Sequence, residues 1–378
     1  MGQIRIIGLH IKTNTQIMNL FSSLLQEYLL LTFIAVFLTS YIIASSVFPV
    51  IIYLSHIKKL TKKPNGRSSH SKAIPTLGGL AIFIGLSISS SLITIVLGDR
   101  TEVAELLSVF VTTTILLFVG IKDDLMEISS RKKFFTQLVS ALLLIGLTGH
   151  YISDFHGLLG INFIPKGLAI IFTTFVYVLV INAYNLIDGI DGLASGLAIT
   201  IFGFCGFIFI TNNHCIDGFI SIASIGGLVA FTRYNLSIDR KVFMGDTGSM
   251  VIGLLIAYQI ISLLSSEHIT GINYQTSNMP ILALALLSYP MFDTLRVFII
   301  RIKDKKSPFT ADRNHIHHKL IDLGLSHIKA SLIIILAVIL LTITSILIQN
   351  LEINHQLIVI LFLGITVFSI PNYIKIKT

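Results

Sequence analysis

Charged side chains are scarce in this chain of 378 residues. They make up 12% of it, about half the share of a typical soluble domain, whereas apolar residues make up 53%. These percentages exclude an ordinary soluble enzyme and a disordered chain. Cysteine is scarce too, with only Cys205 and Cys215. Ten helical residues would hold these two roughly 15 Å apart, so a disulfide-stapled scaffold is also excluded.

The chain is rich instead in long apolar runs, and its mean hydropathy is +0.85. A helix that crosses a bilayer needs about 20 mostly apolar residues. The sequence therefore predicts an all-α polytopic membrane protein with about 11 transmembrane helices. The run at 217–232 is short for a span. The eleven runs are 28–54, 76–97, 103–121, 135–152, 163–184, 193–211, 217–232, 247–266, 278–300, 330–349 and 356–374.

Basic residues predict the orientation of these spans. The formal net charge is +8, and most Lys and Arg residues fall in four loops, at 55–75, 122–134, 233–246 and 301–329. All four loops lie on one side of the predicted topology, and an excess of Lys and Arg is typical of the cytoplasmic side. We therefore expect the N-terminus outside, the C-terminus in the cytoplasm, and the lipid bilayer rather than nucleic acid as the partner of this charge.

Residues 1–27 differ from the rest of the chain because they are polar and weakly patterned. They lack the small-residue cleavage site of a signal peptide. We interpret them as an N-terminal extension before a single integral-membrane domain at 28–375. In an alternative interpretation, these residues lie partly upstream of a true start at Met18.

Carboxylates gather at the helix ends that are predicted to face the cytoplasm. Ionisable groups at membrane depth indicate a functional site by default. A transporter or flippase for a polar lipid, the alternative class, would place them near the bilayer midplane. Their position therefore favours chemistry at the cytoplasmic face. The acids are Asp123, Asp124, Asp188, Asp191, Asp246, Asp293 and Asp312.

The first motif is the adjacent pair Asp123-Asp124, directly after Lys122. Neighbouring carboxylates repel each other unless a cation holds both. The pair is therefore a candidate neighbour of a divalent ion or of a phosphate nucleophile. The alternative is a solvated loop balanced by Lys122 and Arg131.

The second motif, at 182–192, repeats a polar residue every three positions: Asn182, Asn185, Asp188 and Asp191. On one continuous helix, Asn182 and Asp191 would point to opposite sides. The two glycines of the motif are where the helix can break and aim all four side chains inward. Buried Asn and Asp need partners, which a nucleotide or a metal would supply. Capping of helix ends is the alternative for two of them.

The third motif, at 240–249, places Asp246 at the start of a predicted helix, three residues after Phe243. A magnesium ligand with free helix-terminal N–H groups nearby is one interpretation of Asp246, and an N-cap is the other. Phe243 is a candidate for stacking on a flat base, with an ordinary interfacial aromatic as the alternative.

The fourth motif, at 308–318, holds Arg313 and the three histidines His315, His317 and His318. Zinc would favour a closed ligand set, often with cysteine, and none is near. Arginine with histidines suits a pyrophosphate better, and a solvated loop is the alternative. A fifth motif leads from Lys72 into the pair Gly78-Gly79 and could hold a lipid phosphate at the interface.

Together these motifs resemble the polyprenyl-phosphate N-acetylhexosamine-1-phosphate transferases over roughly residues 30–375. The Asn-x-x-Asn-x-x-Asp-Gly-x-Asp-Gly and Phe-Met-Gly-Asp blocks are similar across the wider superfamily, which includes the phospho-MurNAc-pentapeptide transferases. The His-Ile-His-His block resembles the branch that transfers GlcNAc-1-phosphate. One departure is Ala311, where this branch usually has proline.

The resemblance implies a role for each matching residue. Asp246 and Asn185 would serve the metal, and Asp123, Asp124, Asp188 and His317 would be catalytic. Among the catalytic residues we expect Asp123 to stand on the side of the nucleophile. The implied substrate-binding residues are Lys72, Asn182, Asp191, Asn235, Phe243, Arg313, His315 and His318.

The resemblance also implies a reaction. Undecaprenyl phosphate would attack UDP-GlcNAc with Mg²⁺ as cofactor, or Mn²⁺ in its place, to give undecaprenyl-pyrophosphoryl-GlcNAc and UMP. This step starts surface polysaccharides, such as O-antigen or common antigen, at the bacterial cytoplasmic membrane. Another UDP-N-acetylhexosamine, such as the GalNAc, FucNAc or QuiNAc derivative, is the alternative donor. A homodimer is a further expectation by analogy.

Overall fold

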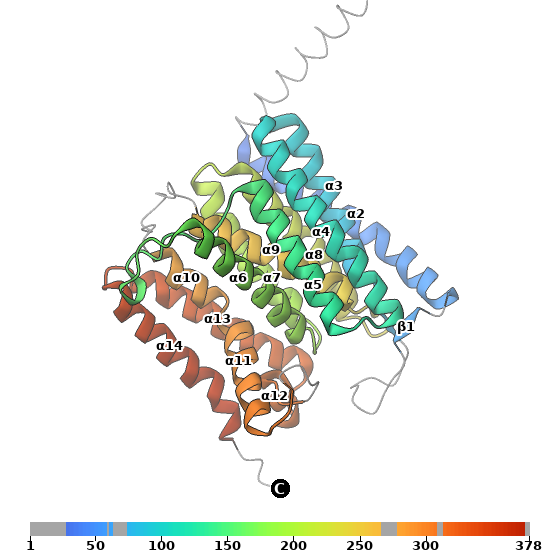
Figure 1. The fold of residues 1–378 in the computed structure, drawn as a ribbon. Coiled ribbons are helices and arrows are strands. Elements are labelled where there is room, and N and C mark those ends of the chain that lie inside the picture. Colours follow the sequence, from blue (N-terminus) through green and yellow to red (C-terminus); the bar gives the residue numbers. More distant parts are fainter. Residues whose placement is uncertain (1–27, 59, 63–73, 266–277, 308–312, 375–378) are drawn as a thin grey trace, which may run out of the picture.

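The computed structural model describes residues 28–58, 60–62, 74–265, 278–307 and 313–374. Within these residues the regular structure is helical apart from one antiparallel pair of short strands, β1 (Thr61–Lys62) and β2 (Ile74–Pro75), and an isolated bridge between Asp154 and Phe163 (Figure 1). The helices are α2 (Leu29–Ile57), α3 (Gly78–Leu97), α4 (Arg100–Met126), α5 (Ser130–Thr148), α6 (Lys166–Ile187), α7 (Leu193–Thr211), α8 (Cys215–Asn235), α9 (Gly245–Ser265), α10 (Met279–Leu286), α11 (Ser288–Lys303), α12 (Ile316–Asp322), α13 (His327–Leu347) and α14 (Ile353–Ser369), with short 3₁₀ turns at Leu158–Gly160 and Ile370–Asn372.

Each predicted apolar run corresponds to a helix or, at 278–300, to the pair α10 and α11, which meet at a bend of 66°. In the described part of the chain, nine helices are long and apolar enough to cross a membrane, or ten if the bent pair is one span. α5 does not qualify, because Arg131, Lys132 and Lys133 occupy its first turn. The prediction of eleven spans is therefore one more than length and composition support. The expectation that 217–232 is short was wrong, since α8 has 21 residues.

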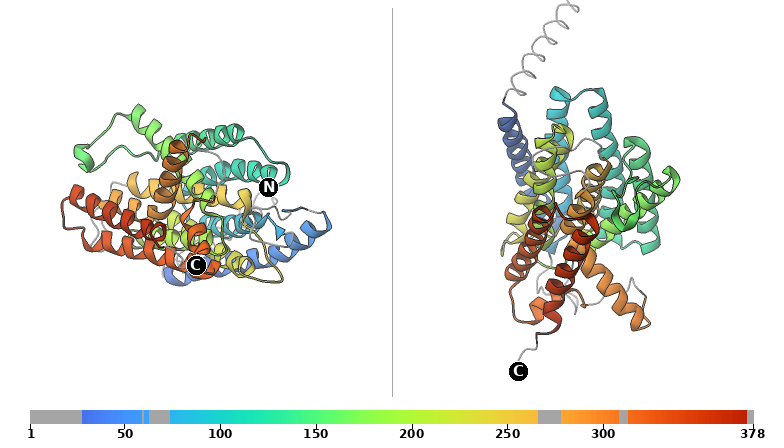
Figure 2. Two further views of the ribbon diagram at one scale, coloured as in Figure 1. Left: turned by 90° about the horizontal axis from the view of Figure 1, so that it is seen from below. Right: turned by 90° about the vertical axis from the view of Figure 1, so that its left-hand side faces the viewer.

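Helix α9 forms the centre of the bundle, in contact with α3, α4, α6 and α7. α2, α3 and α4 flank it on one side, and α10 to α14 lie on the other (Figures 1 and 2). Its apolar stretch is 94% buried, whereas that of α13 is 39% buried although α13 has the higher mean hydropathy, 2.8 against 1.8. Burial is not driven by hydropathy here, because lipid accepts apolar surface as readily as the protein interior does.

Glycines bring α3 and α4 close to the start of α9. A Cβ on Gly79 would lie 2.1 Å from the Gly248 Cα, and one on Gly120 would lie 2.6 Å from the Thr247 Cα. Neither contact leaves room for a side chain, as is common where membrane helices pack closely. In addition, the Gly78 and Gly79 N–H groups donate to the Phe243 and Met244 carbonyls at 3.0 Å. The predicted lipid-phosphate turn thus serves helix packing.

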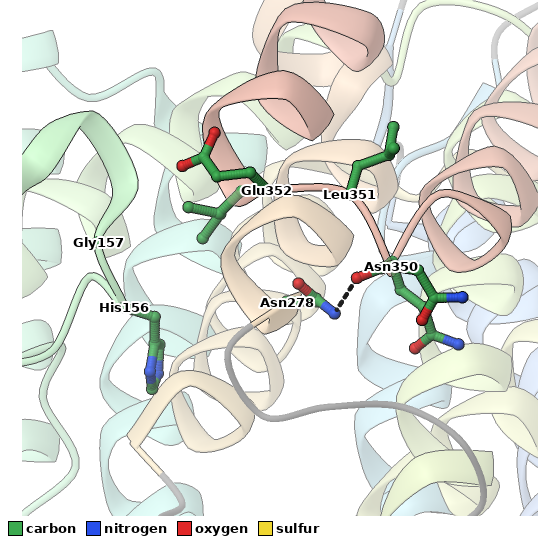
Figure 3. Close-up of a pocket in the computed structure, with 8 residues that line it drawn as sticks. His156, Gly157, Asn278, Asn350, Leu351 and Glu352 are labelled. Atoms are coloured by element: carbon green, nitrogen blue, oxygen red, sulfur yellow. Dashed lines mark hydrogen bonds between the residues drawn. The ribbon is translucent and has the colours of Figure 1, made fainter.

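The bundle has two polar ends. At one end, the last turns of α4, α6 and α8 meet the first turns of α5, α7 and α9, and these connections carry the predicted site motifs. At the opposite end, a cavity of about 400 Å³ opens beside the α13–α14 connection, lined by residues that include His156, Asn278 and Glu352 (Figure 3). There the Asn278 side chain donates to the Gln349 carbonyl at 3.0 Å.

Candidate active site

Two acids and one lysine form the centre of the site. Lys133 Nζ lies 2.5 Å from Asp123 Oδ2 and 3.2 Å from Asp246 Oδ2, so one ammonium group bridges carboxylates from α4 and α9. Asp123 is 7% exposed, and the Lys133 and Asp246 side chains are 25% and 24% exposed. Buried acids this close need a shared cation. The sequence motif did not single out Lys133, since nothing distinguishes it from its neighbours Arg131 and Lys132.

Asn185 completes the surroundings of Asp246. Its amide nitrogen donates to Asp246 Oδ1 at 2.5 Å and to Ser249 Oγ at 2.6 Å. The structure thus brings together two predicted metal residues, Asn185 and Asp246, and adds Asp123 through Lys133. Carboxylate and amide oxygens are ligands that suit Mg²⁺, which takes one or two protein carboxylates and completes its shell with water and substrate phosphates. The carboxylates of Asp123 and Asp246 are close enough to share the charge of Lys133. The same oxygen ligands, together with Asn185, therefore fit a divalent ion.

Asp124 has a different task from its neighbour Asp123. It accepts hydrogen bonds from the N–H groups of Asp246 and Thr247 at 3.0 and 2.9 Å and from the Thr247 hydroxyl at 2.6 Å. These are the bonds of a helix N-cap, supplied here by another helix. The N-cap interpretation considered for Asp246 therefore applies to Asp124. We call Asp123, Asp124, Lys133, Asn185 and Asp246 the carboxylate site.

Gly245 allows Asp124 to reach the start of α9. Its φ of +70° is in the left-handed region, which favours glycine. A Cβ at this position would lie 2.0 Å from the Thr76 carbonyl oxygen and 2.5 Å from Asp124 Oδ2. Gly245 of the Phe-Met-Gly-Asp block is thus required both by close packing and by the turn that directs Asp246 into the site.

Asp191 joins three connections at this end of the bundle. Its carboxylate accepts from Lys241 Nζ at 2.6 Å and from His327 Nδ1 at 2.9 Å, and its carbonyl accepts from Ser331 Oγ at 2.8 Å. Burial raises the pKa of Asp191, but the hydrogen bonds from His327 and Lys241 outweigh it and hold the pKa below its usual value. Asp191 is thus an ionised anchor of the 188–192 turn.

Asn235 and Asn182 are also engaged by the chain itself. The Asn235 side chain accepts from the Gly192 N–H at 2.8 Å and donates to the Val242 carbonyl at 3.0 Å. Asn182 donates to Gln137 Oε1 at 2.7 Å. The predicted substrate-binding role of the two residues stays a prediction. Asn235 ties the 188–192 turn to the segment that carries Phe243.

Phe243 and Asp188 belong to the two segments that Asn235 ties together. The Phe243 ring is half-buried, and Lys241 Nζ lies 6.0 Å from its centroid. Asp188 ends α6 as its C-cap, half-buried, one turn after Asn185. The expected break in the helix thus occurs at Asp188, and it separates Asn182 and Asn185 on α6 from Asp191 in the turn.

The three histidines gather around Asp293 and Tyr289 of α11. His315 Nδ1 lies 2.7 Å from Asp293 Oδ2, whose other oxygen accepts from the Ile316 N–H at 2.9 Å. His317 Nδ1 lies 3.0 Å from the Tyr289 hydroxyl. The sequence analysis counted Asp293 among the acids at the predicted cytoplasmic helix ends but gave it no specific role, and it did not name Tyr289. A wholly buried acid in an apolar run was the available signal for Asp293.

His317 is the most enclosed of the three. It is 1% exposed, and a Cβ on Gly189 would lie 2.4 Å from its Nε2. Burial lowers the pKa of His317 to about 3, and the charge of His318 acts in the same direction. The ring is therefore neutral at pH 7. The structure brings His317 next to Gly189, in the turn after Asp188, and encloses it, while its catalytic role stays a prediction.

Asp293, His315 and His317 could also hold a metal ion, since one ligand atom of each lies within 4.8 Å of the others. The hydrogen bond between His315 and Asp293 already accounts for the closest pair. Arg313 points away from this group, because it pairs with Asp322 at 3.1 Å and is 53% exposed. Lys72 lies outside the described residues, so its predicted role has no structural counterpart.

The chain is similar to known transferases. Residues 106–264, which run from α4 to α9, match the model of glycosyl transferase family 4. The probable undecaprenyl-phosphate N-acetylglucosaminyl 1-phosphate transferase of Bacillus subtilis is 31% identical over 325 residues, 84% of this chain and 87% of the relative. The undecaprenyl-phosphate alpha-N-acetylglucosaminyl 1-phosphate transferases of Yersinia pestis and Escherichia coli K12 are 30% and 27% identical over 74% of this chain and 74% and 73% of their own.

This likeness extends over most of the chain and includes every element of the carboxylate site. It agrees with the resemblance that the motifs carry and with the apolar helices of the structure. The chain therefore belongs to the polyprenyl-phosphate N-acetylhexosamine-1-phosphate transferases of glycosyl transferase family 4, and it is a multi-pass membrane enzyme.

Proposed function

We propose that the protein transfers GlcNAc-1-phosphate from UDP-GlcNAc to undecaprenyl phosphate in a magnesium-dependent reaction, with undecaprenyl-pyrophosphoryl-GlcNAc and UMP as products. The observation that carries the proposal is the arrangement at one end of the bundle, where Lys133 bridges Asp123 and Asp246 and Asn185 donates to Asp246. The names of the relatives from Bacillus subtilis and Yersinia pestis support undecaprenyl phosphate as the acceptor.

The carboxylate site suits phosphoryl transfer, which asks a protein mainly for positioning and charge neutralisation. The second pKa of a phosphomonoester is near 6, so the acceptor phosphate is already largely ionised and needs no strong base. We therefore favour direct attack of this phosphate on the β-phosphorus of the donor, with UMP as the leaving group, over a covalent intermediate on Asp123.

Each residue then has a defined task. Asp246 and Asn185 would hold Mg²⁺, which when bound neutralises charge on the diphosphate. Lys133 keeps Asp123 beside Asp246 and offsets the repulsion between them. Asp124 fixes the first turn of α9, so that Asp246 keeps its place. Phe243 would stack on the uracil, and the Asp191 and Asn235 contacts hold the segment that carries it.

The proposal also implies the membrane in which the enzyme works and the side that its site faces. The site end of the bundle faces the cytoplasm, where UDP-sugars are made, and the enzyme resides in the bacterial cytoplasmic membrane. Its product would start a surface polysaccharide such as O-antigen or common antigen. Mn²⁺ would replace Mg²⁺, since both prefer oxygen ligands.

The test is a transfer assay with purified protein, undecaprenyl phosphate and radiolabelled UDP-GlcNAc, with and without a chelator. Organic-extractable label and released UMP, both lost on chelation and restored by Mg²⁺, are expected. UDP-GalNAc, UDP-FucNAc and UDP-QuiNAc form the donor panel. Preferential transfer from one of these would replace the donor in the proposal, whereas no transfer from any donor would contradict the reaction itself.

A further inference from the structure

A groove with basic walls opens between α4 and α5, beside the carboxylate site. Its cavity is about 420 Å³, and three of its lining residues are the exposed cations Lys122, Arg131 and Lys132. None of the three pairs with an acid in the described part of the chain. Their neighbour Lys133, in contrast, is shared by two acids. We call this cavity the basic groove. It concentrates positive charge that the protein leaves uncompensated.

The remaining walls of the basic groove are largely apolar. Val119 and Ile128 are half-buried, and the Phe135 side chain is 65% exposed. Val119 belongs to the last turns of α4, Ile128 to the connection after it and Phe135 to the first turns of α5. The groove therefore lies at the end of α4, where headgroups meet acyl chains. A soluble anion would use the cations alone. An anionic lipid would use both the cations and the apolar wall.

The groove is connected to the carboxylate site through its own wall. The Ile128 N–H donates to Asp123 Oδ1 at 2.6 Å, and Lys132 precedes the bridging Lys133. Directly before Ile128, Glu127 ends α4 with a φ of +49°, a conformation that few non-glycine residues adopt. An occupant that braces the turn at 127–129 would therefore steady the position of Asp123.

We propose that the basic groove binds an anionic phospholipid of the bilayer, whose phosphate meets Lys122, Arg131 and Lys132 and whose acyl chain lies against Val119 and Phe135. The bound lipid holds the 127–129 turn in place and so supports the carboxylate site. Binding itself is independent of the proposed reaction. Only the effect on turnover rests on it.

Binding is tested first, by titration of phosphatidylglycerol into the purified protein in phosphatidylcholine and native mass spectrometry of the lipid-bound species. Three contacts of the usual interfacial strength correspond to roughly a 100-fold loss of affinity in the triple variant K122Q/R131Q/K132Q. The matched control is K303Q/K305Q/K306Q, which removes three exposed cations at the end of α11. An equal loss in the control would overturn the site, because it would show a diffuse charge effect.

The apolar wall and the source of the phosphate are tested separately. Phe135→Ala keeps every charge and should still weaken long-chain phosphatidylglycerol binding several-fold, whereas inorganic phosphate should not compete at equal concentration. Binding unchanged by Phe135→Ala, or full competition by phosphate, would overturn the lipid assignment. If the triple variant does not fold, single variants such as Lys132→Gln test whether the cations of the groove bind the lipid.

Turnover in nanodiscs then tests the coupling. Wild-type protein should be several-fold faster in phosphatidylglycerol with phosphatidylcholine than in phosphatidylcholine alone, and the triple variant should lose this dependence while matching wild type in phosphatidylcholine. If the triple variant instead raises the KM for undecaprenyl phosphate in phosphatidylcholine, the groove belongs to the acceptor and the proposal is wrong. An inactive wild type would contradict the proposed function and leave the binding result standing.

Discussion

Two groups of buried acids lie at opposite ends of the same helices. α4 carries Asp123 near its last turn and Glu105 near its first, and α9 carries Asp246 in its first turn and Gln259 near its last. At the far end from the carboxylate site, Asp217 accepts from Ser262 Oγ at 2.8 Å and Glu105 accepts from the Tyr258 hydroxyl at 2.8 Å. We call Glu105, Asp217, Tyr258, Gln259 and Ser262 the opposite cluster.

The two groups differ in how their charge is compensated. In the opposite cluster, hydroxyls and an amide surround Asp217, which is only 5% exposed, whereas the Glu105 side chain is 23% exposed and lies 3.4 Å from His150 Nε2. In the carboxylate site, one lysine serves two acids, and a quarter of the Lys133 and Asp246 side chains remains open. The closed hydrogen-bond network around Asp217 specifies packing, whereas an open network with a shared cation keeps charge available for a ligand. The predictions below test this difference.

The largest expected effect separates the two ends with one kind of substitution. Asp246→Asn should lower turnover on the order of 10³-fold, because it removes a charge that the metal and the transition state require. The same change at the opposite cluster, Asp217→Asn, should leave turnover within about threefold, since an amide oxygen still accepts from Ser262. The transfer assay measures both. Equal losses of turnover in the two variants, or full activity in Asp246→Asn, would contradict the proposed difference between the two ends.

Lys133→Met removes the cation that the two acids share. Turnover should fall by roughly 10- to 100-fold, because the acids then repel each other and lose their relative position. Half-saturation by Mg²⁺ should shift to a lower concentration, since the metal no longer competes with an ammonium group. A magnesium titration of the transfer rate measures both effects. If half-saturation instead required a higher Mg²⁺ concentration, Lys133 would not compete with the metal for the two carboxylates.

Asp293→Asn tests the residue that holds His315. The amide keeps the shape but can also donate to the ring nitrogen, so His315 adopts the wrong tautomer in part of the molecules. We expect roughly a tenfold loss of kcat/KM, with little change in folding. Asp322→Asn is the control, because Asp322 forms an exposed ion pair with Arg313. An unchanged pH profile and kcat/KM in Asp293→Asn would remove Asp293 from the site.

Asp124→Ala should act mainly on stability. It deletes the cap of α9 and should cost about 1–2 kcal/mol of unfolding free energy. Asp124→Asn should cost less, because asparagine also caps helices well. Thermal unfolding in detergent measures the difference. A normal unfolding temperature combined with complete loss of activity in both variants would mean that Asp124 is catalytic, as the resemblance implied.

The smallest effect is expected from Tyr258→Phe in the opposite cluster. It removes one hydroxyl that donates to Glu105, and it should cost about 1 kcal/mol without changing kcat or KM. The same unfolding and transfer measurements apply. A clear change in KM would connect the opposite cluster to the site and weaken the contrast between the two ends.

Sequence reasoning found most of the site, because its residues occur in dense motifs at helix ends. It assigned Asn185 and Asp246 to the metal and Asp123 to the side of the nucleophile, and the three residues lie together in the structure. It favoured Asp123 for the side of the nucleophile but did not predict that Asp124 caps α9, since the capping partners come from another helix. It also gave Lys133 no role, because the bond that distinguishes it comes from α9, more than a hundred residues later.

The sequence by itself determined that the chain is a bundle of apolar helices with its motif acids at the helix ends that carry most of the Lys and Arg residues. Apolar length and the position of rare charges are local properties, and a bilayer turns them directly into spans and ends. Only the tertiary structure decided that α9 is the centre, that Asp124 caps it, and that Asp191, Asn235 and Asp293 serve as anchors. Those roles depend on which side chains meet across helices, and inside a membrane neither hydropathy nor spacing distinguishes a neighbouring helix from lipid.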